Sequence, residues 1–298
     1  MRIKLLITAL ACIFFASAQE VGIVSHRQLL KGTEQGIYNP IISADGSKVL
    51  FTSDNLCGLK LYDFNDNVTL RITNAEMAGF EPAFSRDGGS VYFLHQTRDN
   101  QRAFRSIEVY DISSHTTEEA VTKQRGMIPP VAVSGGLMAV SDSGSKLKAS
   151  AESGLAVYAK GAALVVCRNG KETVLSPVET PYTYLWASLS PDATKILFYA
   201  GARGAYICDL QGNLISSLGK VMCPRWAGND YVVAECSTSD GHQYETSQIV
   251  LLAADGSMRK DLTRPESMAM SPSASADGSR IVYSTIDGRL FVMDISIK

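Results

Sequence analysis

Short apolar runs recur along the chain, and each is separated from the next by a turn rich in Ser, Asp and Gly. The runs are β-branched or aromatic and lie at 48–52 (KVLFT), 91–94 (VYFL), 195–198 (KILF), 231–234 (YVVA) and 280–283 (RIVY). A continuous apolar run of this length between turn residues is typical of a strand that is buried on both faces. The pattern therefore predicts an all-β protein.

One phrase precedes three of these runs. It reads NPIISADG at 39–46, EPAFSRDG at 81–88 and SPSASADG at 271–278, with weaker copies around Ala187 and Pro224. The aspartate can accept hydrogen bonds from the backbone ahead of it and the glycine can adopt a positive φ, so each copy predicts a tight turn between a first and a second strand. The proline suits the first residue of its strand, because it has no N–H to donate.

A third and a fourth strand complete each unit. The third strand ends at an aspartate, as at Asp63, Asp111, Asp209 and Asp294, which we interpret as a turn former. Units of about 40 to 45 residues with four strands each are typical of β-propeller blades. First strands near Pro40, Pro82, Pro130, Ala187, Pro224 and Pro272 predict a six-bladed propeller of four-stranded antiparallel blades.

Two units depart from the pattern. In the third, Ser134-Gly135-Gly136 replaces the Asp-Gly turn, and residues 141–154 predict a long loop. In the last, the chain stops at Lys298 before any fourth strand. Residues 25–31 (SHRQLLK) stand where a fourth strand precedes each later unit. We therefore expect this N-terminal strand to pair with the last unit and close the ring, which removes two open sheet edges.

The first residues predict export. Arg2 and Lys4 precede an apolar run at 5–15 that is too short to span a bilayer, and Ala16-Ser17-Ala18 is a small-residue cleavage motif. This arrangement is typical of a secretory signal peptide, so we expect a signal peptide at 1–18, a single propeller domain at 19–298, and a periplasmic or secreted product. The alternative is lipoprotein processing at Cys12. No later segment predicts a transmembrane helix.

Charge and composition restrict the partners. The chain carries a net charge of −2, which becomes −4 once Arg2 and Lys4 are removed. Nucleic-acid binding needs a clustered basic face, and the nearest candidate, Arg98, Arg102 and Arg105, is diluted by acidic neighbours. We therefore expect no nucleic-acid partner, and we expect a monomer.

Motifs for catalysis are sparse. The sequence has no Gly-x-Ser-x-Gly, phosphate loop or dinucleotide fingerprint. Five cysteines remain after cleavage without any CxxC pair, and a Cys223–Cys236 disulfide is the less favoured interpretation. His95 and His242 both lie near connections between second and third strands, so a metal site that gathers them stays a weak alternative. We predict a protein that is not an enzyme and has no cofactor.

The repeat resembles that of TolB-like propellers. The shared features are Pro-x-x-Ser-x-Asp-Gly, an apolar strand, and a strand ending in Asp, and they are clearest at 40–73, 82–122 and 272–295. The resemblance implies a six-bladed periplasmic propeller that binds other envelope proteins over the mouth of its central funnel. Authentic TolB has an α/β domain before its propeller, whereas about twenty mature residues precede Pro40 here. We therefore expect the TolB-like fold and not the TolB role.

The predicted function is binding of an envelope protein or peptide. In a propeller, the loops that enter first strands share one rim with the connections between second and third strands. Aromatic, Arg and Met side chains are enriched at interface centres, and the rim candidates are Tyr38, Phe80, Glu81, Tyr182, Tyr184, Arg203, Arg225, His242, Tyr244 and Met268. Trp226 also lies on this rim, but we expect it in the core. The alternatives are a metal-dependent polysaccharide lyase and a glycan-binding module.

Overall fold

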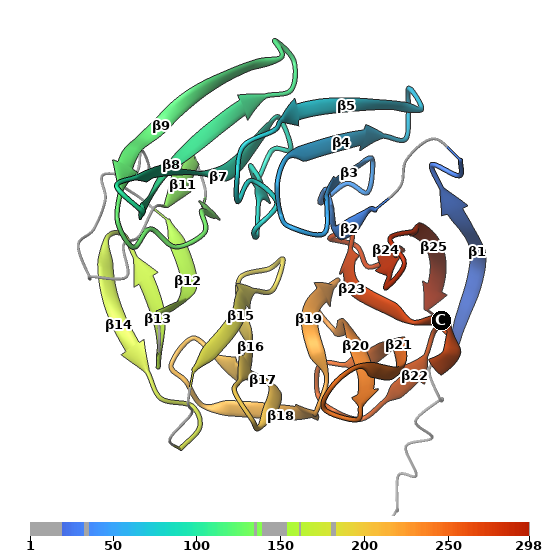
Figure 1. The fold of residues 1–298 in the computed structure, drawn as a ribbon. Helices are drawn as coiled ribbons and strands as arrows, with labels where there is room; N and C mark the ends of the chain where they lie inside the picture. Colours follow the sequence, from blue (N-terminus) through green and yellow to red (C-terminus); the bar gives the residue numbers. More distant parts are fainter. Residues whose placement is uncertain are drawn as a thin grey trace, which may run out of the picture.

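The computed structural model describes residues 20–32, 36–133, 136–138, 154–160, 162–179 and 183–297. Its strands form a ring of six blades around a central axis, as the sequence predicted (Figure 1), and we call the region around that axis the channel. Within these ranges the single helical element is the 3-10 turn η1 (Pro265–Ser267). The all-β six-bladed propeller is therefore confirmed.

Five blades are four-stranded antiparallel sheets, with the first strand next to the channel (Figure 1). Blade 1 contains β2 (Tyr38–Ile42), β3 (Lys48–Thr52), β4 (Leu59–Asp63) and β5 (Val68–Thr73). Blade 2 contains β6 (Ala83–Phe84), β7 (Ser90–Asp99), β8 (Arg102–Asp111) and β9 (Thr116–Gln124). Blade 4 contains β15 (Tyr184–Leu189), β16 (Lys195–Ala200), β17 (Gly204–Asp209) and β18 (Leu214–Gly219). Blade 5 contains β19 (Met222–Ala227), β20 (Tyr231–Ser239), β21 (Tyr244–Ala253) and β22 (Arg259–Asp261).

Blade 3 differs from the others, as its degenerate repeat indicated. Its described residues form a two-stranded ribbon, β10 (Val131–Val133) with β11 (Gly136–Met138), and a separate three-stranded sheet. That sheet contains β12 (Leu155–Lys160), β13 (Ala163–Arg168) and β14 (Lys171–Leu175). The long loop predicted at 141–154 lies outside the described residues except for Gly154.

Blade 6 is completed by the N-terminal strand. It contains β23 (Ala269–Ala274), β24 (Arg280–Thr285), β25 (Leu290–Ile297) and, outermost, β1 (Val21–Leu29). β1 pairs antiparallel with β25, from Val21 opposite Ile297 to Leu29 opposite Leu290. The predicted ring closure is thus confirmed, although β25 continues past Asp294, where the sequence placed its end.

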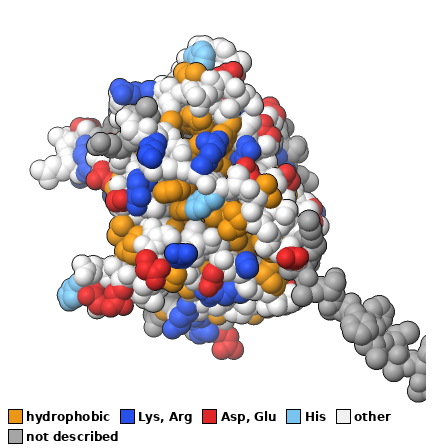
Figure 2. Space-filling view, turned by 90° about the vertical axis from the view of Figure 1, so that its right-hand side faces the viewer, with side chains coloured by type: hydrophobic (Ala, Val, Ile, Leu, Met, Phe, Trp, Pro, Cys, Tyr) orange, Lys and Arg blue, Asp and Glu red, His pale blue; other side chains and the backbone are white. Residues whose placement is uncertain are grey.

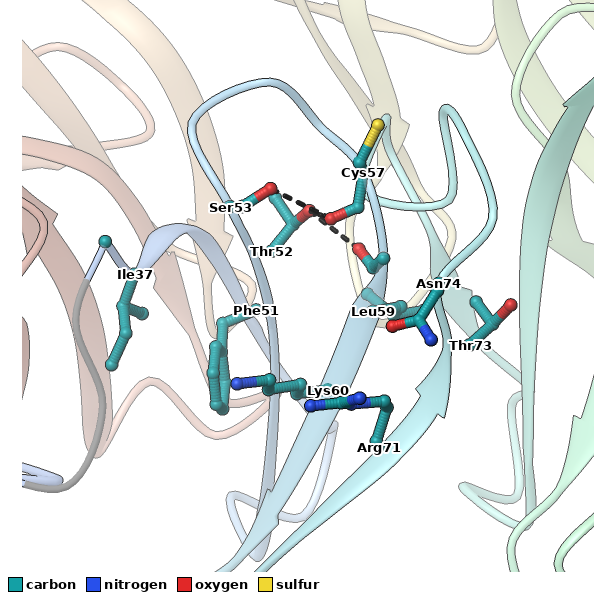
Figure 3. Close-up of a pocket in the computed structure, with 12 residues that line it drawn as sticks. Ile37, Phe51, Thr52, Ser53, Cys57, Leu59, Lys60, Arg71, Thr73 and Asn74 are labelled. Carbon is teal, nitrogen blue, oxygen red and sulfur yellow. Dashed lines mark hydrogen bonds between the residues drawn. The ribbon is translucent and has the colours of Figure 1, made fainter.

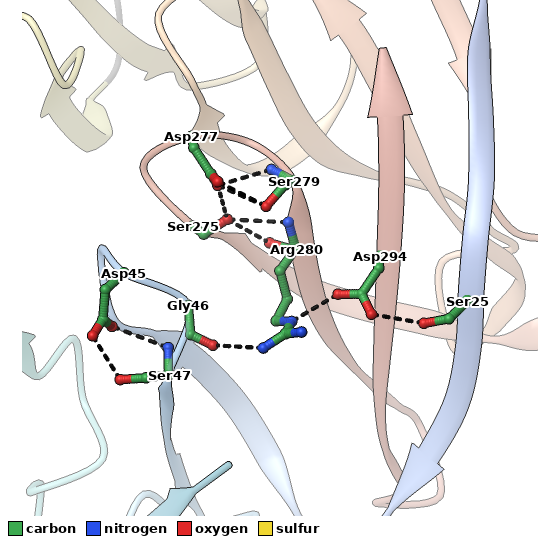
Figure 4. A network of polar contacts seen from close by, with 9 residues as sticks. All are labelled: Ser25, Asp45, Gly46, Ser47, Ser275, Asp277, Ser279, Arg280 and Asp294. Atoms are coloured by element: carbon green, nitrogen blue, oxygen red, sulfur yellow. Dashed lines mark hydrogen bonds and ion pairs between the residues drawn. The ribbon is translucent and has the colours of Figure 1, made fainter. Parts of the chain in front are cut away.

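A polar network fastens this closure (Figure 4). Arg280 donates from Nε to Asp294 Oδ1 at 2.7 Å and from Nη1 to the carbonyl of Gly46 in blade 1 at 3.0 Å. Ser25 Oγ of β1 donates to the other carboxylate oxygen of Asp294 at 2.7 Å. Arg280 therefore links three segments that are far apart in sequence: β1, the last blade and the first blade.

The Ser-x-Asp part of the phrase forms the same turn in four blades. In blade 1 the Ser43 hydroxyl donates to Asp45 and accepts the backbone N–H of Lys48. The equivalent bonds occur at Ser85, Ser190 and Ser275. Gly46, Gly88 and Gly278 share a φ of 73°, the left-handed conformation that the sequence predicted for them.

The prolines do not start their strands, which corrects the prediction. Pro40, Pro224 and Pro272 lie inside β2, β19 and β23 at register shifts, whereas Pro82 and Pro130 directly precede β6 and β10. A proline is tolerated at a bulge, because its position there contributes no N–H to the ladder. The residues before Pro40, Pro82, Pro224 and Pro272 have a positive φ, and so does Trp186 before Ala187 in β15.

Apolar cores lie between adjacent blades. Between blades 5 and 6, for example, Val233, Ile249 and Ile281 are fully buried in one cluster. Trp226 is 8 % exposed and packs between blades 4 and 5, so the core position expected for it is confirmed. Burial of such side chains contributes about 1.5–3 kcal/mol each.

The outer side of blade 6 shows a mixed surface. Figure 2 faces the right-hand side of Figure 1, where β1 and β25 lie, and shows Lys and Arg side chains interspersed with Asp, Glu and apolar ones. Ile23 and Val24 of β1 are 48 % and 69 % exposed. This side therefore has no clustered basic face of the kind that nucleic-acid binding needs.

Candidate functional site

Two long hairpins rise from one rim of the ring. Residues 95–106, at the β7–β8 connection, form what we call the blade 2 arm, and residues 236–247, at the β20–β21 connection, form the blade 5 arm. β7 and β20 are 10 and 9 residues long, whereas the second strands of blades 1, 4 and 6 have 5 or 6. About four additional residues extend a strand by roughly 13 Å. Blades 2 and 5 are three positions apart in a ring of six, so their arms stand on opposite sides of the channel.

The arms carry opposite charges. The blade 2 arm contains Arg98, Arg102 and Arg105 with Asp99, whereas the blade 5 arm contains Asp240 and Glu245. Arg98 pairs with Glu76 at 2.8 Å, and Arg105 donates to Gln96 and to the carbonyl of Met127. Two of the three arginines are thus held by neighbouring segments of the rim.

An ion pair crosses the channel between the two blades. Arg225 of β19 donates from Nη2 to both carboxylate oxygens of Glu81, which precedes β6, at 2.8 and 2.7 Å. The two residues are 144 positions apart in sequence. Their side chains are 25 % and 34 % exposed, so the pair is accessible from solvent. The sequence predicted both as rim residues but did not predict that they bind each other.

Four more polar residues surround this pair, and together the six form what we call the mouth cluster: Asn39, Glu81, Cys223, Arg225, Glu235 and Ser271. Glu235 is 3 % exposed and accepts bonds from the Ser271 backbone N–H at 3.2 Å and from Ser237 Oγ at 3.1 Å. The Ser271 hydroxyl donates to Asn39 Oδ1 at 3.1 Å. The cluster therefore joins blades 1, 2, 5 and 6 around the channel.

Burial changes the ionisation of this cluster. It raises the pKa of the Glu235 carboxyl, against the lowering effect of the two hydrogen bonds. It also raises the pKa of the Cys223 thiol to about 12, which makes this cysteine a poor nucleophile. Burial lowers the pKa of Arg225, but the Glu81 carboxylate raises it, and the net shift is upward. Arg225 therefore keeps its positive charge beside Glu81.

The backbone of the cluster is strained. Four of its residues have a φ between 47° and 51°: Asn39, Glu81, Cys223 and Ser271. This is the left-handed region, which costs a non-glycine residue about 1 kcal/mol or more. Each precedes the proline of its repeat. The same local conformation, repeated around the ring, therefore sets four of the six positions at the mouth.

The other predicted rim residues divide into three groups. Arg203, His242 and Tyr244 are exposed, and the exposed fraction of Tyr244 is 40 %. Tyr38, Phe80 and Met268 are half-buried, with Phe80 packed against the core of blade 2. Tyr184 is 2 % exposed in the core between blades 3 and 4, which leaves it unable to contact a partner. Tyr182 lies outside the described residues.

Sequence reasoning missed Asn39, Cys223, Glu235 and Ser271. One of them left a signal: Glu235 interrupts the apolar run YVVAEC, where a carboxylate is unexpected in a buried strand. The other three stand before the repeated prolines. Their shared position in the repeat would have placed them together around the channel if the bulges at these prolines had been predicted.

The two histidines of the metal hypothesis lie on different arms. His95 Nδ1 hydrogen-bonds Glu108 within blade 2, whereas the backbone N–H of His242 donates to Asp240 at the tip of the blade 5 arm. Among the residues with described positions, no group of three or more His, Cys, Asp or Glu is arranged to hold a metal ion. None of the described cysteines forms a disulfide, and this includes the Cys223–Cys236 pair: the five are Cys57, Cys167, Cys208, Cys223 and Cys236.

A pocket lies on blade 1 at the same rim as the arms (Figure 3). Its lining includes Phe51, Ser53, Lys60, Arg71 and Asn74. Lys60 and Arg71 stand opposite each other on β4 and β5. This cavity therefore presents two cationic side chains beside hydroxyl and amide groups.

Comparison with known proteins supports the fold alone. No family model matches the chain, and no curated protein matches it. Among solved structures, TolB from Acinetobacter baumannii aligns with a TM-score of 0.54 at 17 % identity, over 80 % of this chain and 57 % of that one. The chain thus spans less than two thirds of that TolB, and its fold is that of a TolB-like six-bladed propeller.

Two further solved structures are matched over nearly their whole length. Oligogalacturonate lyase from Vibrio parahaemolyticus has a TM-score of 0.57 at 11 % identity, over 93 % of this chain and 98 % of that one. The β-propeller domain of Cps50 (Swd1) from Myceliophteria thermophila has a TM-score of 0.60 at 11 % identity, over 93 % and 100 %. At such identities the likeness says nothing about activity.

The part of the chain that the structure describes contains no helix with the length and apolar character needed to cross a membrane.

Proposed function

We propose that this protein is an exported, non-catalytic propeller that binds a protein or peptide of the cell envelope at the mouth of its channel. The observation that carries the proposal is the pair of arms on opposite blades, which flank a solvent-accessible ion pair that joins those same blades. Exposed aromatic and charged side chains stand on the arms, and such residues are enriched where proteins bind one another.

The location rests on two supports. The first 18 residues have the pattern of a secretory signal peptide, and they lie outside the described residues. The fold is shared with TolB, for which the sequence resemblance implies a periplasmic place. We therefore propose cleavage after Ala18 and a periplasmic or secreted product, with lipoprotein processing at Cys12 as the alternative.

Affinity capture from envelope extract tests the function. The mature protein serves as bait beside a variant in which His242 and Tyr244, both exposed on the blade 5 arm, are replaced by Ala. We expect the variant to lose the captured partner, because interface aromatics contribute about 2 kcal/mol or more. Val174→Ala on β14 is the control, because Val174 is 64 % exposed on blade 3, two blades away from the blade 5 arm. Equal capture by all three proteins would contradict the proposal.

A second candidate is binding or cleavage of an acidic glycan. The fold is shared with an oligogalacturonate lyase, and the blade 1 cavity presents Lys60 and Arg71, which could bind the carboxylates of such a sugar. Purification without chelator, followed by metal analysis and an assay for unsaturated sugar products, distinguishes the two. A bound divalent metal with product formation would favour the lyase, and His95 and His242 would then be the residues to replace.

A further inference from the structure

The ion pair between Glu81 and Arg225 leaves part of the guanidinium unused. Arg225 spends a single nitrogen, Nη2, on both oxygens of Glu81. Nε and Nη1 have no hydrogen-bond partner among the residues that the structure describes. A guanidinium can bind carboxylates through two parallel N–H donors, a geometry that Glu81 does not use here. Arg225 can therefore bind a second carboxylate, or exchange Glu81 for a carboxylate that receives two parallel N–H bonds.

Glu81 is weakly anchored compared with its partner. Arg225 lies inside β19, a strand of six residues, whereas Glu81 lies outside β6, which has only two. Glu81 also has no partner strand at its own position, since β6 begins only at Ala83. With 34 % of its side chain exposed, Glu81 can swing into solvent without crossing packed atoms of the core.

Exchange of one carboxylate for another costs little. Removal of one partner from a half-buried ion pair leaves an uncompensated charge, which is strongly unfavourable. If a second carboxylate binds Arg225 as Glu81 leaves, the guanidinium remains paired throughout. Glu81 then regains full hydration at the rim. Exchange therefore breaks the Glu81–Arg225 ion pair at a lower free-energy cost than simple dissociation does.

We propose that Arg225 is a carboxylate-binding site at the channel mouth, and that Glu81 occupies it internally until a carboxylate of the bound partner replaces it. The proposal rests on the proposed function, since it names the chemistry that the mouth recognises in a protein or peptide. The carboxylate comes either from the C-terminus of the partner or from an acidic side chain. Both sources present the same two oxygens to Arg225.

The test is a titration that follows the Arg225 Nε–H resonance in the ¹⁵N-labelled mature protein. N-acetylglycine serves as the probe for a chain terminus, and N-acetyl-aspartic acid α-amide serves as the probe for a side chain. N-acetylglycinamide is the neutral control. Arg225→Met assigns the resonance, because the signal disappears in that variant.

Glu81→Gln is the decisive variant, because it removes the internal competitor and keeps its shape. We expect it to bind at least one of the two acids about tenfold more tightly than the unchanged protein, since an internal occupant lowers the apparent affinity by the fraction of sites that it fills. Glu119→Gln, at an exposed glutamate on β9 outside the arms and the mouth cluster, should leave that affinity unchanged. The acid that binds more tightly identifies the source of the carboxylate.

Three results would overturn the proposal: equal affinity in Glu81→Gln and the unchanged protein, a shift by the neutral amide equal to that of the acids, or saturable binding of galacturonate without either peptide acid. If Glu81→Gln does not fold, titration of the unchanged protein decides, because the absence of a saturable shift there contradicts the site. Partner capture that depends on the arms, together with a silent Arg225, would refute this inference and leave the proposed function standing.

Discussion

At the scale of single residues, backbone conformation explains most of the repeat. The hydroxyl and carboxylate of Ser-x-Asp satisfy the donors of the turn, and the glycine after Asp supplies a φ of 73° in three blades. Blade 4 has Ala193 at the equivalent place, with a φ of 58°. An alanine pays a steric cost in the left-handed region that glycine does not pay.

We therefore predict that Ala193→Gly stabilises the protein. Relief of the left-handed strain should exceed the entropy that the unfolded chain gains with glycine, for a net increase of about 0.5–1 kcal/mol in the free energy of unfolding. Denaturant unfolding measures it. The control is Ala159→Gly in β12, where Ala159 pairs regularly with Leu164, φ is not positive, and the same change should destabilise by about 0.5–1 kcal/mol. A destabilised Ala193→Gly would show that the turn is not strained.

Glu235 should make stability depend on pH. Its folded pKa is raised by burial, so the folded state holds this proton more tightly than the unfolded chain does. Stability therefore falls as the pH rises from the unfolded value of the carboxyl through the folded value, and the cost is complete above it. We predict that Glu235→Gln is more stable than the unchanged protein at neutral pH.

Thermal melts of both proteins between about pH 4 and pH 8 measure this effect. The advantage of Glu235→Gln should shrink as the pH falls, because the unchanged carboxyl becomes protonated and neutral as well. An advantage that stays constant with pH, or grows toward acid, would mean that the buried carboxyl is not the cause.

At the scale of elements, the ring depends on contacts between its two ends. β1 covers the outer edge of β25, and Arg280 connects both to the first blade through Gly46. Its guanidinium also lies over the Phe64 ring, with Cζ 4.9 Å from the centroid. Arg289, by contrast, pairs with Asp287 within its own turn.

Replacement of these two arginines should separate closure from surface charge. We predict that Arg280→Met lowers the free energy of unfolding by about 1–3 kcal/mol, because it removes charge-assisted bonds to two other segments. Arg289→Met should cost at most about 0.5 kcal/mol, because an exposed local ion pair contributes little. Equal losses in urea unfolding would contradict the role given to Arg280.

Deletion of residues 20–31 should have a much larger effect. It exposes the outer edge of β25 and removes Leu29, which is 2 % exposed in the core between blades 6 and 1. We predict a fall in Tm of about 10 °C or more, which corresponds to several kcal/mol for a domain of this size. Unchanged melting would show that β1 does not close the ring.

At the scale of the whole molecule, the sequence predicted what depends on local order along the chain. Each second strand lies where its apolar run stands, and β3 matches its predicted residues at both ends. The bulges at Pro40, Pro224 and Pro272 were not predicted, because a proline fits the start of a strand and a bulge equally well. Blade 3 was recognised as degenerate, but the sequence did not predict that its described residues form a two-stranded ribbon and a separate three-stranded sheet.

The site was predicted only in part, for a physical reason. Glu81 and Arg225 were both candidates, but their contact depends on the closed ring, which brings positions 144 residues apart to opposite sides of one channel. The predicted count of six blades already placed units 2 and 5 opposite each other. A contact between Glu81 and Arg225 could have been predicted from that arrangement. Glu235 and Cys223 act through burial, which cannot be derived from residue type alone.

Photo-crosslinking from the blade 5 arm tests the central claim most directly. A photoreactive residue is placed at Tyr244 in one protein and at Val174 on β14 in another, and each is irradiated in envelope extract. If the channel mouth binds an envelope protein, a discrete protein adduct should form from position 244 and be absent from position 174. An adduct from position 174 alone, or from neither position, would contradict the claim that the mouth between the two arms is the binding surface.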